Sequence, residues 1–386
     1  MIWRKGAARV SLVFTAEQEE MRRAVRAFLT AKSPSSEVRR LMETSEGIDR
    51  DVWNQLAAQL ELHGLAVPEE YGGSGFGPIE QLIVFEECGR ALLCAPFFGT
   101  VALAIPALLA AGDPAAAKDL LPGLVSGATV ASLAFTEDDG DWNPGATQLQ
   151  AEAAEPAATD EGAWALTGAK SFVIDGAAAD LFLVVGRTGR GLSVFAVLAD
   201  APGLNRVQLE TLDLTRKQVR LSFDGTPARL IGADGAGQSI LERTLDLAAV
   251  LLAAEQVGGA QACLDLTVEY AKVRTQFGRP IGSFQAIKHR CADMLVALES
   301  ARSAVYHAAW TAADAPDELP AAAAMAKAMA SEAYNFCAGE TIQLHGGIGF
   351  TWEHDAHLYY RRAHSTALFL GDPAYQRELL ADRLGI

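Results

Sequence analysis

Residues 270–289, YAKVRTQFGRPIGSFQAIKH, gather side chains that can bind a nucleotide. Arg274, Gln276 and Gln285 stand around Phe277, which is expected to be exposed in a turn rich in glycine and proline. Arginine presents a planar fork of donors that suits a phosphate, and an aromatic ring beside it can face a flat heterocycle. A plain turn between two helices explains the glycines and the proline but not these four side chains. The residues by themselves leave both interpretations open.

Residues 343–352, QLHGGIGFTW, place three glycines where a long helix must end. Either Gly346 or Gly347 can form the C-terminal cap of that helix. The additional glycines within five residues indicate that another molecule approaches the bare backbone. The segment is therefore either a helix cap alone or also a stretch of bare backbone that meets a ligand.

A metal centre is the other chemistry that this segment suggests. His345 can combine with His354 and His357, which are three residues apart on a predicted helix, and with Glu353. Aromatic and basic residues flank these histidines, and the sequence offers no separate carboxylate-rich segment to complete a ligand set. We therefore expect no metal.

Hydrophobic periodicity predicts helices, then strands, then helices again. Within residues 1–129, apolar residues recur at helical spacing, and Thr15 and Gln18 have the spacing of a capping box. Within 130–236, short β-branched and aromatic runs alternate with glycine, aspartate and proline, which predicts an antiparallel β-barrel or sandwich. Long apolar helices return over 237–386. The prediction is a mainly α protein with an N-terminal helical domain, a small central β domain and a C-terminal helical domain.

The C-terminal domain is predicted to be a four-helix bundle. Its first helix begins near residue 238, and Gly258 and Gly259 within this helix are expected to allow close approach of a neighbouring helix. Three more helices are predicted over roughly 285–312, 320–345 and 353–369.

Composition argues against several classes of partner. The 386 residues include 32 basic and 48 acidic side chains, and the net charge of −16 disfavours nucleic acid and anionic membranes. No apolar run is long enough for a membrane span, which needs about 18 residues. Five scattered cysteines indicate reduced thiols, and residues 1–14 lack the apolar stretch of a signal peptide. A cytoplasmic location is expected.

Six segments together resemble the acyl-CoA dehydrogenase family of flavoproteins, in their order and spacing: PEEYGG, EECGRAL, FTED, GAKSFV, YAKVRTQFGRPIGSFQ and QLHGGIGF. The resemblance covers roughly residues 14 to 386 and extends to actinobacterial members that act on bulky or steroid side-chain acyl-CoAs. It implies α,β-dehydrogenation of an acyl-CoA thioester with hydride transfer to FAD. It also implies a dimer or tetramer, and an electron-transfer flavoprotein as electron acceptor.

The resemblance further assigns roles to individual residues. Asp246 stands at a position that often contacts the pantetheine of the substrate. Segments that wall the flavin ring match Phe135, Thr136, Phe172, Val173 and Ile174. Positions that hold the pyrophosphate and adenosine half of a neighbouring subunit's FAD match Arg274, Gln276, Phe277, Gln285, Gln343, Gly346 and Gly347.

The proton-abstracting carboxylate is missing from both positions where the resemblance puts it. Counting from the matched flanks places Leu370 at the usual glutamate and Asp372 at the threonine that follows it. The alternative position on the long helix of the bundle is Ala248, followed by Ala249 where an arginine often stands. Neither leucine nor alanine can take up a proton.

Three functional interpretations follow. The chain is one subunit of a hetero-oligomeric dehydrogenase, with the base on a homologous partner. Alternatively, it is a self-sufficient homotetramer that uses a non-standard base such as Asp372; Glu255, about 10 Å along the helix axis from Ala248, is a weaker candidate. The third interpretation is a non-catalytic flavin- or acyl-binding subunit. The missing carboxylate favours the first interpretation, and the retained FAD-contacting residues disfavour the third.

Overall fold

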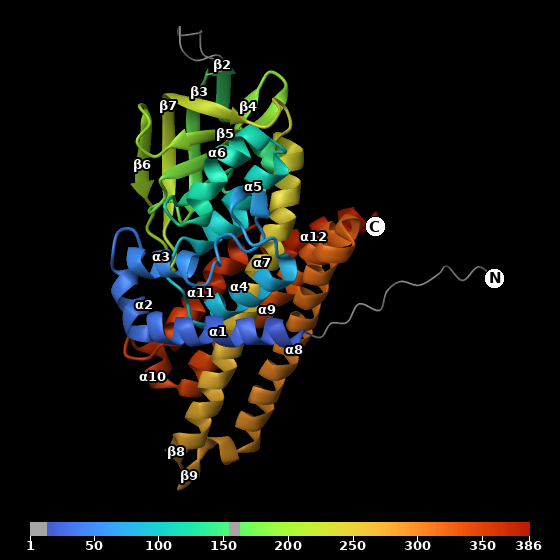
Figure 1. Ribbon diagram of the computed structural model, residues 1–386. Helices are drawn as coiled ribbons and strands as arrows, with labels where there is room; N and C mark the ends of the chain where they lie inside the picture. Colours follow the sequence, from blue (N-terminus) through green and yellow to red (C-terminus); the bar gives the residue numbers. More distant parts are fainter. Residues whose placement is uncertain (1–13, 154–162) are drawn as a thin grey trace, which may run out of the picture.

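The computed structural model describes residues 14–153 and 163–386, and it has three regions in chain order (Figure 1). Helices come first, a β-barrel follows, and a bundle of long helices ends the chain. This confirms the predicted order of helical, β and helical regions. Residues 1–13, and with them the expectation about a signal peptide, lie outside the described part.

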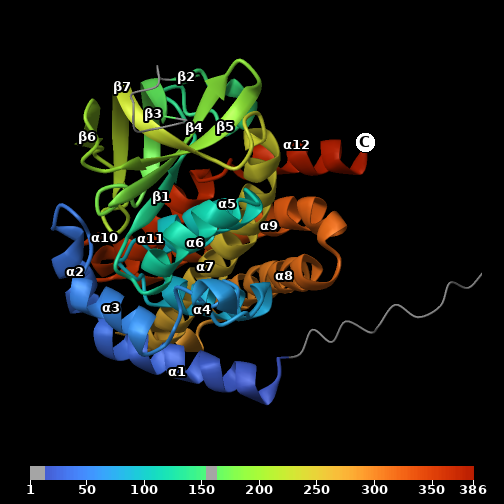
Figure 2. The ribbon, with the colours of Figure 1, turned by 45° about the horizontal axis from the view of Figure 1, so that its top comes forward.

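The N-terminal region is built from helices that cover one side of the bundle. They are α1 (Ala16–Lys32), α2 (Ser35–Met42), α3 (Arg50–Ala58), α4 (Pro78–Arg90), α5 (Ile105–Ala110) and α6 (Pro114–Val125). The predicted capping box begins α1, because Thr15 Oγ1 accepts a bond from Gln18 N at 3.2 Å and the Gln18 side chain accepts one from Thr15 N at 2.9 Å. Figure 2 shows α4 and α5 over the longest helix of the bundle.

The β region is a closed barrel with two attached strands. The strands are β1 (Ala131–Ala134), β2 (Gln150–Ala153), β3 (Ala163–Ile174), β4 (Leu181–Thr188), β5 (Gly191–Leu198), β6 (Leu204–Gln208) and β7 (Gln218–Ile231). The ring runs β2–β3–β7–β5–β4 and closes by pairing β4 with β2, which leaves the ring without a free edge. The expected antiparallel pairing holds for most neighbours, whereas β1–β4 and β2–β4 are parallel.

The C-terminal region is the predicted bundle, with its fourth side made of two shorter helices. Its long helices are α7 (Gly237–Val273), α8 (Gln285–Asp314) and α9 (Leu319–His345), and α10 (Gly347–Phe350) follows. Both α11 (Ala356–Leu368) and α12 (Pro373–Leu384) pack on α9. The helix predicted from residue 353 begins at Ala356, because the preceding residues form turns. A hairpin of β8 (Thr275–Gln276) and β9 (Arg279–Pro280) joins α7 to α8 at the end farthest from the barrel (Figure 1).

Two glycines of α7 lie where helices cross most closely. A Cβ added to Gly258 would lie 1.8 Å from the Glu86 carbonyl oxygen of α4, and one added to Gly259 would lie 2.4 Å from the Tyr334 ring of α9. The predicted close approach is therefore confirmed. Among the described helices, only α7 is long and apolar enough to cross a membrane, but 89% of its apolar window is buried inside the protein.

The cysteines are free thiols, as their scattered spacing predicted. Four of them are buried and Cys291 is partly buried. Burial raises the pKa of Cys291, with a smaller contribution from the charge of Glu340. The thiols therefore belong to the packed interior and form no disulfide.

Candidate active site

Two cavities meet at the turn between α11 and α12. The smaller one, of about 360 Å³, lies between the barrel loop 135–144, the start of α7 and the helix α12. The larger one, of about 900 Å³, is lined by barrel residues and by the facing parts of α9 and α11. Trp142 and Tyr375 line both cavities. These two aromatic side chains therefore stand between them.

Leu370 faces the smaller cavity from a strained turn. Its φ of +59° is left-handed, which costs a non-glycine residue about 1–2 kcal/mol, and Gly371 follows with φ of +92°. The Gln376 amide donates a hydrogen bond to the Leu370 carbonyl and holds the turn in place. A hydrocarbon side chain is thus fixed toward the cavity at the position that the predicted alignment with the family assigns to the catalytic glutamate.

From α7, Ala249 faces the smaller cavity, whereas Ala248 does not. Ala248 is fully buried in the core, and the α7 side chains on the cavity wall follow helical spacing: Gln238, Glu242, Leu245, Asp246 and Ala249. Each alanine offers only a methyl group. The position that the resemblance equates with the alternative base, Ala248, therefore neither carries a carboxylate nor lines the smaller cavity.

Asp246 faces the smaller cavity, as expected for a substrate-contacting residue, but it is held by an arginine. Burial raises the pKa of the Asp246 carboxyl, and the charge of Arg383, whose Nη2 lies 2.6 Å from Oδ1, opposes this shift. Glu242 brings a second carboxylate one turn earlier. Sequence reasoning missed both neighbours. Helical spacing from Asp246 could have found Glu242, whereas Arg383 is 137 residues away and only the fold brings it there.

Asp372 lies on the other side of the turn. Its Oδ1 accepts a hydrogen bond from Tyr375 N at 2.8 Å and caps the start of α12. The side chain is exposed and lines the larger cavity, not the smaller one. The candidate base Asp372 and the substituted position Leu370 therefore face different cavities.

Glu255 belongs to a buried ionic cluster and lines neither cavity. Its carboxylate lies 2.7 Å from Arg216 Nη2 and 2.9 Å from Arg362 Nη1. Burial by itself raises the pKa of Glu255, but the two guanidinium groups outweigh burial and hold the pKa below its usual value. Arg362 also bonds Asp213 at 2.7 Å. Glu255 is thus a structural anion, which removes it as a candidate base.

The residues predicted to wall the flavin ring are divided between the cavities and the core. Phe172 lines the larger cavity, 37% exposed and with φ of +56°, while Phe135 lines the smaller one. Thr136, Val173 and Ile174 are buried beneath them. Only one of the five side chains, that of Phe172, therefore reaches the larger cavity.

The larger cavity fits a flat heterocycle. The Phe172 ring stands in its wall, and Gly140 and Gly371 leave bare backbone at its rim. Asn335 contributes a buried Oδ1 that has no hydrogen-bond partner among the described residues. Because buried acceptors are nearly always satisfied, this oxygen favours a ligand that offers an N–H or O–H donor.

The residues predicted to hold the other half of the cofactor lie at the far end of the bundle. The β8–β9 hairpin follows α7 at the end of the bundle farthest from the barrel (Figure 1). Arg274 is the C-terminal cap of α7, and Phe277 in the hairpin is 92% exposed. The end of α9 lies beside the end of α7, because the His345 ring stacks on Tyr270 with 4.3 Å between centroids. The set at this end comprises Arg274, Gln276, Phe277, Gln285, Gln343, Gly346 and Gly347. Within one chain, no residue of this set lines the larger cavity.

Comparison with known proteins decides the family. The acyl-CoA dehydrogenase N-terminal domain model matches residues 15–128, and the corresponding C-terminal domain model matches residues 235–385. The chain belongs to the acyl-CoA dehydrogenase family. It is an oxidoreductase with the family's fold, and its cofactor is FAD.

Individual relatives of this dehydrogenase match over nearly their full length. Acyl-CoA dehydrogenase IpdE2 of Mycobacterium tuberculosis is 39% identical over 94% of this chain and 95% of its own. The ChsE4–ChsE5 complex of Mycobacterium tuberculosis aligns with a TM-score of 0.87 and 30% identity, over 97% of this chain and 99% of the other. A variant of the Tcur3481–Tcur3483 steroid ACAD aligns with a TM-score of 0.85 and 32% identity, over 96% and 98%.

The histidines of the dehydrogenase near α10 make contacts other than metal ligation. His345 Nδ1 lies 2.7 Å from the Thr341 carbonyl, and His354 Nδ1 accepts a bond from Ala356 N at 3.1 Å. His357 packs against the Trp352 ring at 4.3 Å between centroids. Within residues 14–153 and 163–386, no group of three or more side chains has the arrangement of a metal site.

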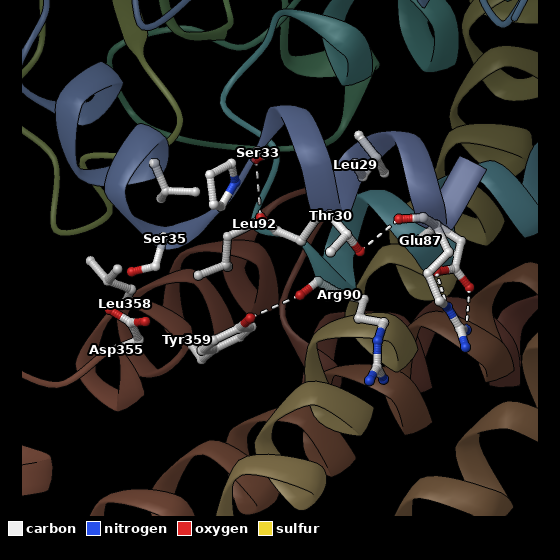
Figure 3. Close-up of a pocket in the computed structure, with 14 residues that line it drawn as sticks. Leu29, Thr30, Ser33, Ser35, Glu87, Arg90, Leu92, Asp355, Leu358 and Tyr359 are labelled. Atoms are coloured by element: carbon white, nitrogen blue, oxygen red, sulfur yellow. Dashed lines mark hydrogen bonds and ion pairs between the residues drawn. The ribbon is translucent and has the colours of Figure 1, made fainter. Parts of the chain in front are cut away.

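A third cavity of the dehydrogenase, about 370 Å³, lies among α1, α2, the end of α4 and α11 (Figure 3). Its polar groups bond to the protein itself: Tyr359 donates to the Arg90 carbonyl at 2.8 Å, and Ser33 donates to the Ala91 carbonyl at 3.3 Å. None of the predicted site residues lines it. We therefore place the active-site region at the first two cavities.

Lys327 is fully buried behind the turn that carries Leu370. Its Nζ donates to Ser331 Oγ at 2.8 Å and to the carbonyls of Ala367 at 3.2 Å and Gly371 at 3.3 Å, all uncharged acceptors. Burial lowers the pKa of Lys327 to about 7, and the charge of Asp372 opposes this only in part. The lysine therefore ties α9 to the turn at the cost of burying an ammonium group.

The depressed pKa of Lys327 predicts how stability depends on pH. Between pH 7 and the ordinary lysine pKa, the unfolded chain binds this proton more strongly than the folded chain, so the free energy of unfolding rises with pH. From pH 7 to pH 9, the free energy of unfolding of the wild type should rise by up to about 2 kcal/mol more than that of Lys327→Met. Urea unfolding at both pH values measures the difference. Lys118→Met, at an exposed position, is the control, and parallel profiles for wild type and Lys327→Met would reject the prediction.

Proposed function

We propose that this chain is one subunit of a hetero-oligomeric acyl-CoA dehydrogenase, and that a homologous partner chain carries the proton-abstracting carboxylate. One observation carries the proposal: the smaller cavity meets the hydrocarbon side chain of Leu370 from the α11–α12 turn, and the second base position, Ala248 on α7, is an alanine buried in the core that lines neither cavity. The naming of two components in the ChsE4–ChsE5 and Tcur3481–Tcur3483 relatives supports it.

The residues matched to the two halves of FAD do not share a cavity in one chain, which supports a cofactor shared between two chains. In the proposal, Arg274 and Gln276 hold the pyrophosphate of an FAD whose ring lies in the partner, and the backbone at Gly346 and Gly347 lies along the same cofactor. FAD supplies the acceptor for the hydride when it is bound. The exposed Phe277 becomes covered in that assembly. This chain therefore completes the site in which the partner's carboxylate takes the α-proton.

The remaining expectations belong to the same proposal. The substrate is a bulky or steroid side-chain acyl-CoA, which the steroid ACAD among the relatives supports. The assembly is a tetramer in the cytoplasm, and an electron-transfer flavoprotein accepts the electrons.

The test is anaerobic bleaching of the flavin band. The chain purified alone should hold little flavin, or hold flavin that a panel of acyl-CoAs does not bleach. The chain is then co-expressed with a homologue that carries glutamate at the position matching Leu370. Acyl-CoA should bleach the flavin band of the resulting complex. Substituting that glutamate by glutamine in the homologue should abolish bleaching in the complex, because an amide cannot take up the α-proton.

Bleaching of the chain alone would reject the two-subunit proposal and favour the self-sufficient enzyme. Asp372 is then the base to test, because it is the exposed carboxylate at the turn and lines the larger cavity. In that case Asp372→Asn should lower the bleaching rate at least 100-fold, as loss of a general base does. If the flavin is bleached neither in the chain alone nor in the complex, the chain is a non-catalytic binding subunit.

A further inference from the structure

We propose that the first half of α8 forms a contact between two copies of this chain, in which the two helices pack antiparallel about a two-fold axis. This half of α8 and the end of α7 project beyond the N-terminal helices (Figure 1). Of residues 285–300, only Met294 and Leu298 are buried, whereas most of residues 301–311 are. Leu295 is 47% exposed and Val296 is 67% exposed, and apolar side chains gathered on one exposed face mark a protein–protein contact.

Four exposed side chains form a stripe along this part of α8. They are Lys288, Ala292, Leu295 and Glu299, at successive spacings of four, three and four residues. Such spacings put side chains on one face of a helix, and by helix rise the stripe is about 16 Å long. Arg302 of the same helix also pairs with Glu299, through Oε1. Along its length the stripe therefore presents a cation, a small apolar group, a large apolar group and an anion.

The stripe is complementary to its own reverse. A two-fold axis between residues 293 and 294 places Lys288 opposite Glu299 of the second copy, and Ala292 opposite Leu295 of the second copy. Because the axis repeats each contact, the pairing gives two ion pairs and two contacts of a large with a small apolar side chain. A two-fold arrangement of parallel helices would instead place each charge opposite its own copy. The charges therefore favour the antiparallel arrangement of two identical stripes.

A cavity of about 440 Å³ beside the stripe supports the same arrangement. It lies between the end of α7 and the start of α8, and its apolar lining residues include Val268, Ala271, Ile287 and Cys291. Lys288 of the stripe also lines it. The two-fold axis places Val296 of the second copy opposite Cys291. The second copy thus covers the cavity and buries a valine side chain that is exposed in one chain.

The inference goes beyond the proposed function and does not depend on it. An assembly that holds two copies of this chain and two of a homologue can have an exact two-fold axis between the two like chains. The stripe shares no residue with the candidate FAD contacts, so the contact should form in the chain alone, with or without flavin. Failure of the flavin-bleaching test would therefore leave this contact unaffected.

Exchange of the two charges tests the contact. Sedimentation equilibrium of the full chain alone, at low ionic strength where charges are weakly screened, measures the dissociation constant of the two copies. Lys288→Glu should raise this constant at least about tenfold, because a carboxylate then faces Glu299 of the second copy, and Glu299→Lys should do the same. The double variant Lys288→Glu/Glu299→Lys again pairs opposite charges, so it should associate as the wild type does.

Lys118→Glu is the control, because it makes the same charge change at an exposed position of α6 and should leave the dissociation constant unchanged. Melting followed by circular dichroism verifies that the variants are folded, as expected for substitutions at exposed positions. The inference is overturned if the wild-type chain stays monomeric alone or associates only with a homologue. It is also overturned if a single charge reversal has no effect, or if the double variant fails to recover the association.

Discussion

Arg362→Met is expected to lower the free energy of unfolding by about 3–5 kcal/mol, because it strips one partner from a buried ionic cluster. Arg362 is 1% exposed and bonds Asp213 on the barrel side and Glu255 in α7. Without it, the Asp213 carboxylate loses its ion-pair partner, and Glu255 keeps only Arg216. Breaking a buried pair leaves an uncompensated charge, which costs far more than the pair contributes net.

Equilibrium urea unfolding of the full chain measures this loss. The matched control is Arg377→Met, which removes a surface ion pair with Glu332 and should cost no more than about 1 kcal/mol. The folded-state pKa of Glu255 is lowered. Its contribution to the free energy of unfolding is therefore present above the unfolded-state pKa and is lost as the pH falls through the folded-state pKa. Equal losses for the two variants would contradict the role assigned to the cluster.

Gly258→Ala is expected to destabilise the protein by about 3 kcal/mol or more, at the upper end of the range for overpacked cores. The new Cβ would lie 1.8 Å from the Glu86 carbonyl oxygen and 2.9 Å from Arg90 N, both backbone atoms of α4. A flexible side chain can move away, but the backbone of a buried helix cannot. The crossing of α4 and α7 must therefore open, and the tight packing on both sides of it is lost.

Gly339→Ala provides the control for this prediction within the same bundle. Gly339 lies in α9, and a Cβ there meets no atom within 4 Å, so alanine should stabilise the helix by up to about 1 kcal/mol. Thermal unfolding followed by circular dichroism compares the two variants. If Gly258→Ala melts at or above the wild-type temperature, the crossing is not the tight contact that we describe.

Local patterns in the sequence predicted much of the fold. The capping box at Thr15, the strand region after residue 130 and the close approach at Gly258 each depend on neighbouring residues or on helical spacing, and all are confirmed. The predicted start of α11 near residue 353 was three residues early. Here turn contacts, including the bond from Ala356 N to His354, replace the helix that periodicity alone suggested.

Partners distant in the chain could not be predicted in the same way. Arg383 lies 137 residues from Asp246, and Arg362 lies 149 residues from Asp213. No periodicity links such pairs. Arg383 meets Asp246 because α12 packs on α9 and its side chain reaches α7, and Arg362 meets Asp213 because α11 lies against the loop before β7. Helical counting could place Glu255 on the side of α7 that carries Ala248, but not reveal the two arginines that neutralise it.

The sequence by itself determined the family and the order of the three regions. It also predicted that Leu370 stands at the position of the catalytic glutamate, which remains a prediction. Only the tertiary structure decided that Leu370 and Asp372 face different cavities, and that Asn335 carries an unsatisfied oxygen. The physical reason is that residue identity and spacing determine what a side chain can do. Whether a side chain has a bonding partner, lines a cavity or does neither depends on the atoms that distant segments of the chain place beside it.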